Sequence, residues 1–379
     1  MQRFLVAVLI LFSLLLLLMA GCAEDAPNAV GIGLLPPKDS LHITSLTKQA
    51  GSSSTELKRI SGNSLYLLLG RSQSVEARLL LRFLTTSGDF PSARIDSAML
   101  YLTPVYLFKD TIGLLDVSVH LANSTSWSPS TFLWDSVTAG FINDTVAGRF
   151  NHTIAKSDTQ IAIRLDTSIV RQWLATGAGS VILTPSVATT VLAGFYNSSV
   201  TGVLPRFVIT YHDTLDTLHT YQTILDAATF VADAPAPSAT NRFFTQSAVT
   251  RRGLLKFDVS SIPSRATISD AVLEVSVDSA LSVFASPRRD SMLVHLNLAS
   301  TGDSLGFGVL GVATDSTRKT ISFQVNTIVQ KWVSHAFANN GFVLRNYSEF
   351  SGGERMAFFG AGADSLHRPK LSIRYSIVP

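Results

Sequence analysis

Most of the chain alternates between apolar and polar residues with a period of two, as strands do when they bury one face of a sheet. Residues 117–121 (VSVHL) and 371–375 (LSIRY) are examples, and such runs predict half-buried antiparallel strands. Clusters of Gly, Pro, Asn and Ser interrupt the runs at roughly 8–12-residue intervals, the spacing of β-sandwiches. The pattern therefore predicts an all-β chain built from two-sheet sandwiches.

Two segments depart from this alternation and predict short helices. Apolar residues at positions i, i+1, i+4 and i+5 share one face of a helix, and we expect Trp173 and Trp332 to pack in the core on that face. The residues with this spacing are Ile169, Val170, Trp173 and Leu174 in one segment and Ile328, Val329, Trp332 and Val333 in the other. The expected N-caps are Thr167 or Ser168 and Asn326 or Thr327.

The chain also repeats itself, because six blocks of its first half recur in the same order in its second half. Residues 78–83 (RLLLRF) match 252–257 (RGLLKF), and 204–211 (LPRFVITY) match 368–375 (RPKLSIRY). A repeat of this length indicates a tandem duplication of one structural unit. We therefore expect two antiparallel, jelly-roll-like β-sandwiches at 39–211 and 216–379, each with one short helix. The short junction at 211–215 predicts that the sandwiches move little relative to each other.

The N-terminus has the features of a secretion signal. Arg3 precedes an apolar run at residues 4–20, and Gly21 stands directly before Cys22. Residues 1–21 therefore predict a signal peptide that ends in a lipobox. A transmembrane anchor is the alternative, but the run is at the short limit for crossing a bilayer, which takes about 20 apolar residues.

This arrangement resembles that of bacterial lipoproteins, in which the cysteine after the cleavage site is acylated. The resemblance implies that Cys22 is lipidated and that 22–38, which contain spaced Gly and Pro residues, are a tether. It places the protein in the bacterial cell envelope, anchored to a membrane by lipid, in the outer membrane or at the cell surface.

The second repeat resembles the DNRLRE-type, or disaggregatase-related, domain, which is similar to carbohydrate-binding β-sandwich modules. The resemblance lies in 254–263 (LLKFDVSSIP), 327–332 (TIVQKW), 340–344 (NGFVL) and 368–371 (RPKL). The first repeat adds Trp127 and Trp134 of the family pattern, which the second repeat lacks, and we expect both mainly to pack. The resemblance implies a surface protein that binds polysaccharide.

Composition excludes several other classes. With 30 Lys and Arg against 27 Asp and Glu, the chain offers no charge excess for nucleic acid. One cysteine rules out an internal disulfide framework, and the eight histidines lie singly, without the spacing of metal ligands. We expect no metal site and no cofactor, with loop-bound calcium left open, and we expect His120 and His295, at equivalent positions, to be structural.

No catalytic motif is present. The sequence contains neither a Gly-x-Ser-x-Gly elbow nor a phosphate-binding loop, and no acidic pair recurs in both repeats outside turns. We therefore expect a protein that is not an enzyme. A polysaccharide-degrading enzyme stays a distant alternative.

Sugar binding requires an aromatic plane beside planar hydrogen-bonding groups. Predicted loops supply this combination at Tyr196 with Asn197, and at Arg345, Asn346 and Tyr347. The leading hypothesis is a membrane-anchored cell-surface lipoprotein that binds polysaccharide or matrix glycan without catalysis. The alternative is a structural or adhesive envelope protein with a protein partner, which a flat, exposed apolar patch would favour.

Overall fold

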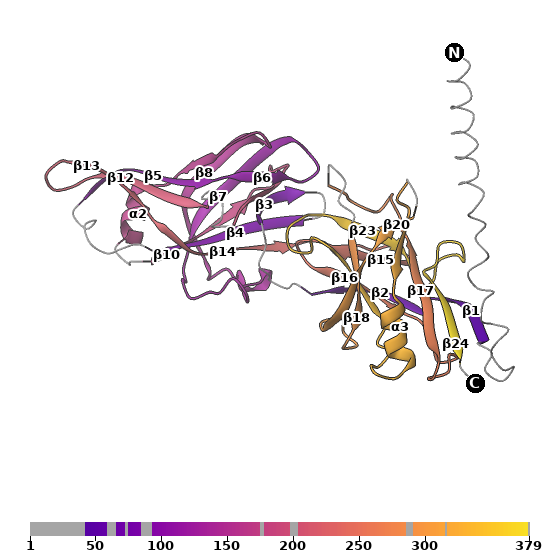
Figure 1. Ribbon diagram of the computed structural model, residues 1–379. Helices are drawn as coiled ribbons and strands as arrows, with labels where there is room; N and C mark the ends of the chain where they lie inside the picture. The colour runs from indigo at the N-terminus through magenta and orange to yellow at the C-terminus, as the bar shows by residue number, and fades with distance from the viewer. Residues whose placement is uncertain are drawn as a thin grey trace, which may run out of the picture.

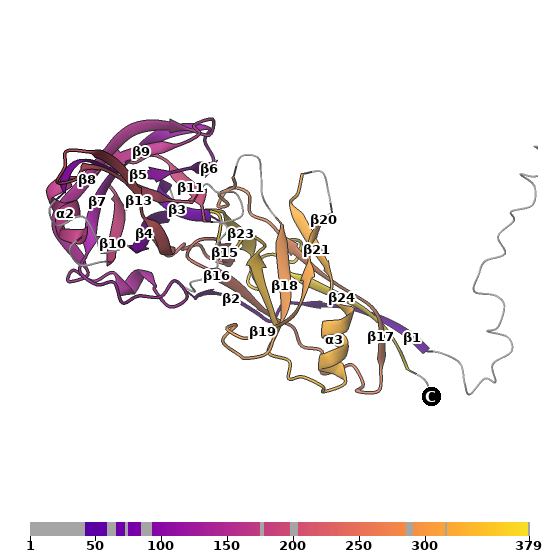
Figure 2. The same cartoon turned by 60° about the vertical axis from the view of Figure 1, so that its left-hand side comes forward.

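The computed structural model describes residues 42–58, 66–72, 75–84, 93–174, 178–197, 204–285, 291–314 and 317–377. More than half of these residues lie in antiparallel strands, and two short helices complete the two sandwiches seen end to end in Figures 1 and 2. The all-β prediction is therefore confirmed. The predicted signal peptide at 1–21, the tether at 22–38 and Cys22 lie outside the described residues.

The first sandwich consists of a four-stranded sheet and an eight-stranded sheet. The smaller sheet has the order β13 (Leu218–Gln222), β12 (Arg206–His212), β5 (Arg94–Leu102) and β9 (Ile161–Arg164). The larger has the order β6 (Pro104–Leu107), β11 (Leu192–Tyr196), β3 (Tyr66–Ser72), β4 (Val75–Leu84), β10 (Ala178–Pro185), β7 (Ile112–Ala122) and β8 (Ile142–Ala155), with β14 (Ile224–Asp233) also paired to β4.

The second sandwich repeats this plan. One sheet has the order β1 (His42–Gln49), β24 (Lys370–Ile377), β17 (Thr267–Ser276), β21 (Thr320–Gln324) and β20 (Val312–Ala313). The other has the order β19 (Leu305–Leu310), β18 (Met292–Asn297), β22 (Phe342–Asn346), β16 (Arg251–Lys256), β15 (Arg242–Gln246) and β23 (Arg355–Phe359), with β2 (Ser52–Leu57) also paired to β16.

The two sandwiches exchange their opening strands. β1 and β2, which begin the first repeat, pair with β24 and β16 of the second sandwich, while β13 and β14, which begin the second repeat, pair with β12 and β4 of the first. Figure 1 shows β1 beside β24 at one end of the molecule and β13 beside β12 at the other. The predicted units 39–211 and 216–379 thus match the sequence repeat, but each packed sandwich contains the opening strands of the other repeat. Equivalent opening strands fit equivalent positions in both sandwiches, so the pattern of one repeat does not specify the sandwich in which its opening strands pair.

The exchange also moves the expected junction. Residues 211–215, predicted to join the sandwiches, instead lie where β12 turns into β13, at the far end of the first sandwich (Figure 1). The chain crosses between sandwiches after β2 and again after β14. Two covalent connections therefore link the sandwiches, instead of one.

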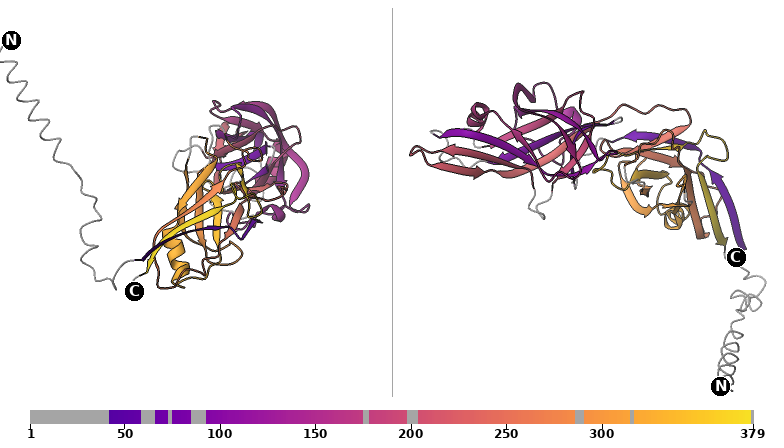
Figure 3. Two further views of the ribbon diagram at one scale, coloured as in Figure 1. Left: turned by 90° about the vertical axis from the view of Figure 1, so that its right-hand side faces the viewer. Right: turned by 90° about the horizontal axis from the view of Figure 1, so that it is seen from above.

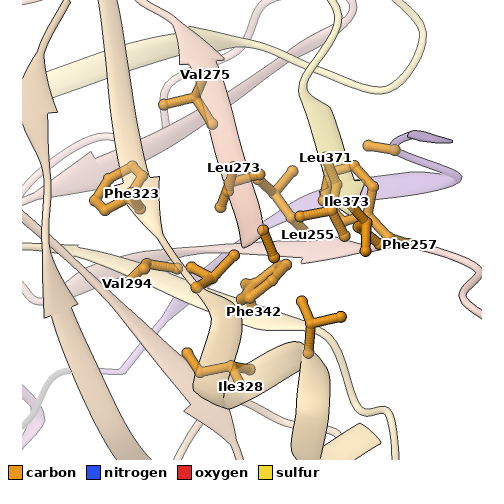
Figure 4. Close-up of a cluster of buried hydrophobic side chains, with 14 of the residues drawn as sticks. Leu255, Phe257, Leu273, Val275, Val294, Phe323, Ile328, Phe342, Leu371 and Ile373 are labelled. Atoms are coloured by element: carbon orange, nitrogen blue, oxygen red, sulfur yellow. The ribbon is translucent and has the colours of Figure 1, made fainter. Parts of the chain in front are cut away.

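Each sandwich buries the alternate residues of its strands. β5 and β17 share the same alternation of buried and more exposed positions, as the period-two pattern predicts. Figure 4 shows side chains from both sheets of the second sandwich meeting one another and Ile328 of a helix; among them are Leu255, Leu273, Val294, Phe323, Phe342 and Ile373.

The two helices are α2 (Thr167–Leu174) and α3 (Asn326–Val333), where the sequence predicts them. In α3 the four expected apolar residues are buried, and the ring of Trp332 lies 4.5 Å from that of Phe342. The core position predicted for Trp332 is confirmed, whereas the side chain of Trp173 lies outside the described part.

The expected helix caps differ from the structure. At the start of α2, Asp166 Oδ1 accepts hydrogen bonds from the Ser168 amide at 2.8 Å and hydroxyl at 2.6 Å. These bonds hold the pKa of Asp166 below its ordinary value. The N-cap of α3 is Val325, with no side-chain cap, because Asn326 Oδ1 instead accepts from the Ala271 amide at 3.1 Å. The Ser168 hydroxyl thus donates to Asp166 instead of capping α2, and the Asn326 side chain bonds to β17 instead of capping α3.

An apolar cluster joins the sandwiches. Leu68, Tyr106, Phe108 and Leu192 of the first sandwich are buried in one cluster with Ala248, Val249 and Val283 of the second. The Tyr106 hydroxyl donates to Glu354 Oε1 at 3.3 Å. Figure 3 shows the two sandwiches in contact along this junction from two further directions. The junction therefore combines apolar packing with a buried polar contact.

Candidate functional site

A cavity of about 620 Å³ opens beside the end of β22 in the second sandwich. Its wall combines small hydroxyl side chains, one aromatic ring and groups of both charges; it is formed by Ser247, Ser291, Gly311, Val312, Ala313, Arg318, Ile321, Asn346, Tyr347, Ser348 and Glu354. Tyr347 is 61% exposed. The cavity thus places an accessible aromatic ring beside amide, guanidinium and hydroxyl groups.

The end of β22 fixes the position of Tyr347. Strand pairing continues through Asn346, opposite Met292 of β18, and the Tyr347 amide then donates to the Ser291 carbonyl at 2.9 Å. Because the backbone is held on both sides of this point, the ring projects at the strand end without packing in the core. Of the residues predicted to bind sugar, Tyr347 has the most accessible side chain in the structure.

Asn346 lines the same cavity, but its side-chain amide already makes three hydrogen bonds within the protein. Its Oδ1 accepts from the Thr245 hydroxyl at 2.6 Å, and its Nδ2 donates to Ser247 Oγ at 3.0 Å and to the Glu354 carbonyl at 3.1 Å. A buried amide with its partners satisfied stabilises the structure around it. Asn346 therefore holds three segments together at the base of the cavity.

Arg345 points into a separate network of buried charges. Arg252 donates to both carboxylate oxygens of Glu349, at 2.8 and 3.0 Å, and Arg345 Nη1 lies 3.7 Å from the same carboxylate. Burial lowers the pKa of Arg345. Arg345 therefore lies two positions before Tyr347 in the sequence but is not one of the residues that line the cavity.

His295 belongs to this network. Arg345 Nε donates to His295 Nε2 at 3.1 Å, so the ring proton lies on Nδ1, which is 3.0 Å from the Gly306 carbonyl. Burial lowers the pKa of His295, which agrees with a neutral ring. In the first sandwich His120 Nδ1 lies 3.0 Å from the Asn143 carbonyl, also on the neighbouring strand. The prediction that both histidines are structural matches these contacts.

Tyr196 and Asn197 lie in the first sandwich, at the end of β11. Tyr196 is half-buried opposite Tyr66 of β3, and its amide donates to the Thr103 carbonyl at 3.2 Å. Neither residue lines the cavity beside Tyr347. The structure therefore does not bring the two predicted sugar-binding groups together, and their role in sugar binding stays a prediction.

The tryptophans of the first repeat pack against arginines. Trp127 is buried, its Nε1 donates to Ser180 Oγ at 2.9 Å, and the Arg82 guanidinium lies 5.1 Å from its ring. Arg78 stacks on Trp134 at 4.3 Å. These residues belong to the segment that covers the outer face of β4, β10 and β14. Packing therefore accounts for both tryptophans, as expected.

Sequence reasoning missed most of the cavity wall. Ser247, Ser291 and Arg318 come from loops far apart in the chain, and isolated Ser or Arg residues have no distinguishing local pattern. Within the described ranges, no group of three His, Cys, Asp or Glu side chains could hold a metal ion. No helix in the described part of the chain has the length and apolar character needed to cross a bilayer.

No protein-family model matches the chain, and no curated protein matches it. Among solved structures, the major pilin subunit of Bacillus cereus aligns with 11% identity over 72% of this chain and 55% of its own, with a TM-score of 0.20. A structure of infectious bursal disease virus aligns with 10% identity over 91% of this chain and 80% of its own, with a TM-score of 0.11. The chain thus spans about half of the pilin, and likenesses at these TM-scores carry no functional argument.

Proposed function

We propose that this protein is a lipid-anchored bacterial envelope protein that binds polysaccharide without catalysis, through the cavity beside Tyr347. The observation that carries the proposal is the exposed ring of Tyr347 at a cavity of about 620 Å³ whose wall also contains three serine side chains, Arg318 and Glu354. A pyranose has an apolar face that stacks on an aromatic ring and a rim of hydroxyls that require hydrogen-bond partners. Both requirements are supplied at one place.

The positions of the termini support display at a surface. β1 lies beside β24, and both strands are at the end of the second sandwich that faces away from the first (Figures 1 and 3). A lipid at Cys22 would tether the protein through the segment that leads into β1. The first sandwich would then be the part of the molecule furthest from the membrane (Figure 1).

A binding screen tests the glycan proposal. Purified protein in detergent is titrated with acidic and neutral polysaccharides, with and without calcium. We expect saturable binding that Tyr347→Ala weakens at least about tenfold, because the variant removes the stacking plane, while Tyr347→Phe retains it. Tyr196→Ala is the matched control, since Tyr196 does not line the cavity. Equal binding by Tyr347→Ala and the unchanged protein would place the site elsewhere, and no binding to any polymer would contradict the proposal.

The anchor is tested separately. Cys22→Ala should abolish incorporation of radiolabelled fatty acid, since the thiol is the acylated group in the proposal. Retained labelling would disprove lipidation at Cys22 whatever the glycan screen shows.

One observation favours a protein partner as the second candidate function. The edge formed by β19 and β20 exposes Phe307, Leu310 and Val312, whereas the corresponding edge of the first sandwich, β8, exposes Arg149, Asn151 and Thr153. Exposed apolar side chains on a sheet edge are typical of interaction surfaces. If no polysaccharide binds, Phe307→Ser combined with Leu310→Ser should abolish co-purification of an envelope protein.

A further inference from the structure

The first described strands form a strap across the second sandwich. We call residues 42–58, which contain β1 and β2, the strap. All eight residues of β1 pair with β24, from His42 opposite Ile377 to Gln49 opposite Lys370, and all six residues of β2 pair with β16. Backbone hydrogen bonds thus attach the strap to both sheets of the sandwich.

The side chains of the strap add little apolar contact. Ile43 is 64% exposed, Leu57 is 41% exposed, and residues 52–56 have the sequence SSSTE. Ala50 is the buried apolar residue of the strap, and Leu46 packs partly against the core. Burial of apolar surface supplies most of the stability of a packed element. The sandwich therefore loses little of its apolar stabilisation when the strap leaves.

The remaining side-chain contacts of the strap are polar. Thr55 Oγ1 accepts from the Phe244 amide at 2.8 Å, and Ser53 Oγ accepts from the Ala361 amide at 2.9 Å. Lys58 Nζ lies 2.9 Å from Asp303 Oδ1. Water can replace each of these partners when the strap opens, so opening costs less than it would for a strand held by a core.

We propose that the strap is exchangeable between molecules, so that the strap of one copy takes its place on the second sandwich of another copy. The donated strap would re-form the same registers with β24 and β16, because it is chemically identical to the strap that it replaces. Swapping an identical element is a low-cost route to association. The protein already shows within one chain that β24 and β16 pair with strands supplied from outside their own repeat.

Lipid anchoring would increase this exchange. Copies confined to a membrane have a high effective concentration for one another, which favours contacts between copies over release into solution. This increase depends on the proposed anchor, while the exchange itself depends on the strand pairing. The product is a strand-linked dimer or chain of the protein at the envelope.

Two co-expressed full-length copies test the proposal. One carries Thr47→Cys in β1 and the other carries Ser372→Cys in β24, each with a different epitope tag. These residues face each other, with their side-chain oxygens 3.5 Å apart, so cysteines there suit a disulfide. A disulfide that joins the two differently tagged copies forms when the strap of one copy pairs with β24 of the other. We expect this mixed dimer after mild oxidation of whole cells.

The controls use the other exchanged strands. Thr220→Cys in β13 and Thr210→Cys in β12 are also opposite each other. They should form no mixed dimer, because β14, which directly follows β13, is held in its own sandwich by buried apolar side chains. Two copies that both carry Thr47→Cys report collisions and any contribution of Cys22. A mixed dimer several-fold above both controls supports the proposal.

A single chain carrying both Thr47→Cys and Ser372→Cys completes the test. If it closes its internal disulfide while the co-expressed pair stays at the control level, exchange between copies is overturned. If neither forms, the pairing of β1 with β24 is itself wrong and the proposal fails with it. Fractionation of the same cells shows independently whether the protein is membrane-bound, so a missing anchor is distinguished from a missing exchange.

Discussion

β2 and β14 occupy equivalent places in the two sandwiches and are held there by different forces. β14 contributes Val231 to an apolar cluster on the outer face of its sheet, and its residues also reach the core and the junction cluster. β2 presents mostly serine, threonine and glutamate. The same backbone topology is therefore held largely by apolar packing in the first sandwich and largely by backbone hydrogen bonds in the second. The difference makes β14 a permanent part of its sandwich and the strap a removable one.

The largest effect is expected from equivalent substitutions in these strands. Val231 pairs with Arg78, and Glu56 pairs with Arg252 at the matching position. Val231→Asn buries an amide in place of an apolar side chain and should lower the free energy of unfolding by about 2–3 kcal/mol. Glu56→Asn should change it by less than about 0.5 kcal/mol. Urea unfolding of both variants measures the difference, and equal losses would remove the distinction between the strands.

Hydrogen exchange of the unmodified protein should show a similar contrast between β14 and β1, the other strand of the strap. Amides of β1 should exchange at least about 30-fold faster than those of β14, since an element with few buried contacts opens without global unfolding. Mass spectrometry of peptic peptides covering 42–49 and 224–233 resolves the two strands. Equal protection would mean that the strap opens only when the sandwich unfolds.

The strands and helices of each repeat were predictable from the sequence, because burial alternates along the strands. The buried face of α3 was predictable from the spacing of Ile328, Val329, Trp332 and Val333. The exchange was not predictable. β1 and β13 begin equivalent repeats, so a pattern of polar and apolar residues describes both equally well and names neither partner. Only the three-dimensional pairing decides between two equivalent edges.

The candidate site was predictable only in part. Tyr347 could be identified because it is an aromatic residue in a predicted loop, next to residues with planar hydrogen-bonding groups. Arg345 and Asn346 share that segment, but their bonds to His295 and Thr245 depend on segments far away in the chain. Polar residues at a strand end look alike in sequence whether they face water or a buried partner.

A smaller effect is expected where the strap ends. Lys58→Met removes the contact with Asp303, and partly exposed ion pairs contribute about 0.5 kcal/mol. Exchange in 42–58 should therefore accelerate by about twofold, while exchange in 218–233 stays unchanged. An equal acceleration in both segments would show that Lys58 stabilises the whole molecule.

The smallest effect is expected from acid. Hydrogen bonds from Thr301 and then Lys58 hold the pKa of Asp303 below its ordinary value of 3.8. A carboxyl group with a lowered pKa contributes stability that is complete above that ordinary value and is lost as the pH falls through the lowered one. Strap opening should therefore increase as the pH falls below about 4, and Asp303→Asn should flatten this dependence in hydrogen exchange. A dependence that persists in the variant would assign it to another group.

The pairing of His42 with Ile377 has a consequence for how the protein is made. The strap is synthesised long before its partner strand β24, since 325 positions separate Thr47 from Ser372. Contacts between distant parts of a chain form slowly, so the strap must stay unpaired until β24 has been synthesised. An apolar strand waiting in this way would be prone to aggregate. The serine-rich sequence of β2 suits a segment that must stay soluble while it is unpaired, and the same polar side chains leave β2 with little apolar contact in the folded protein.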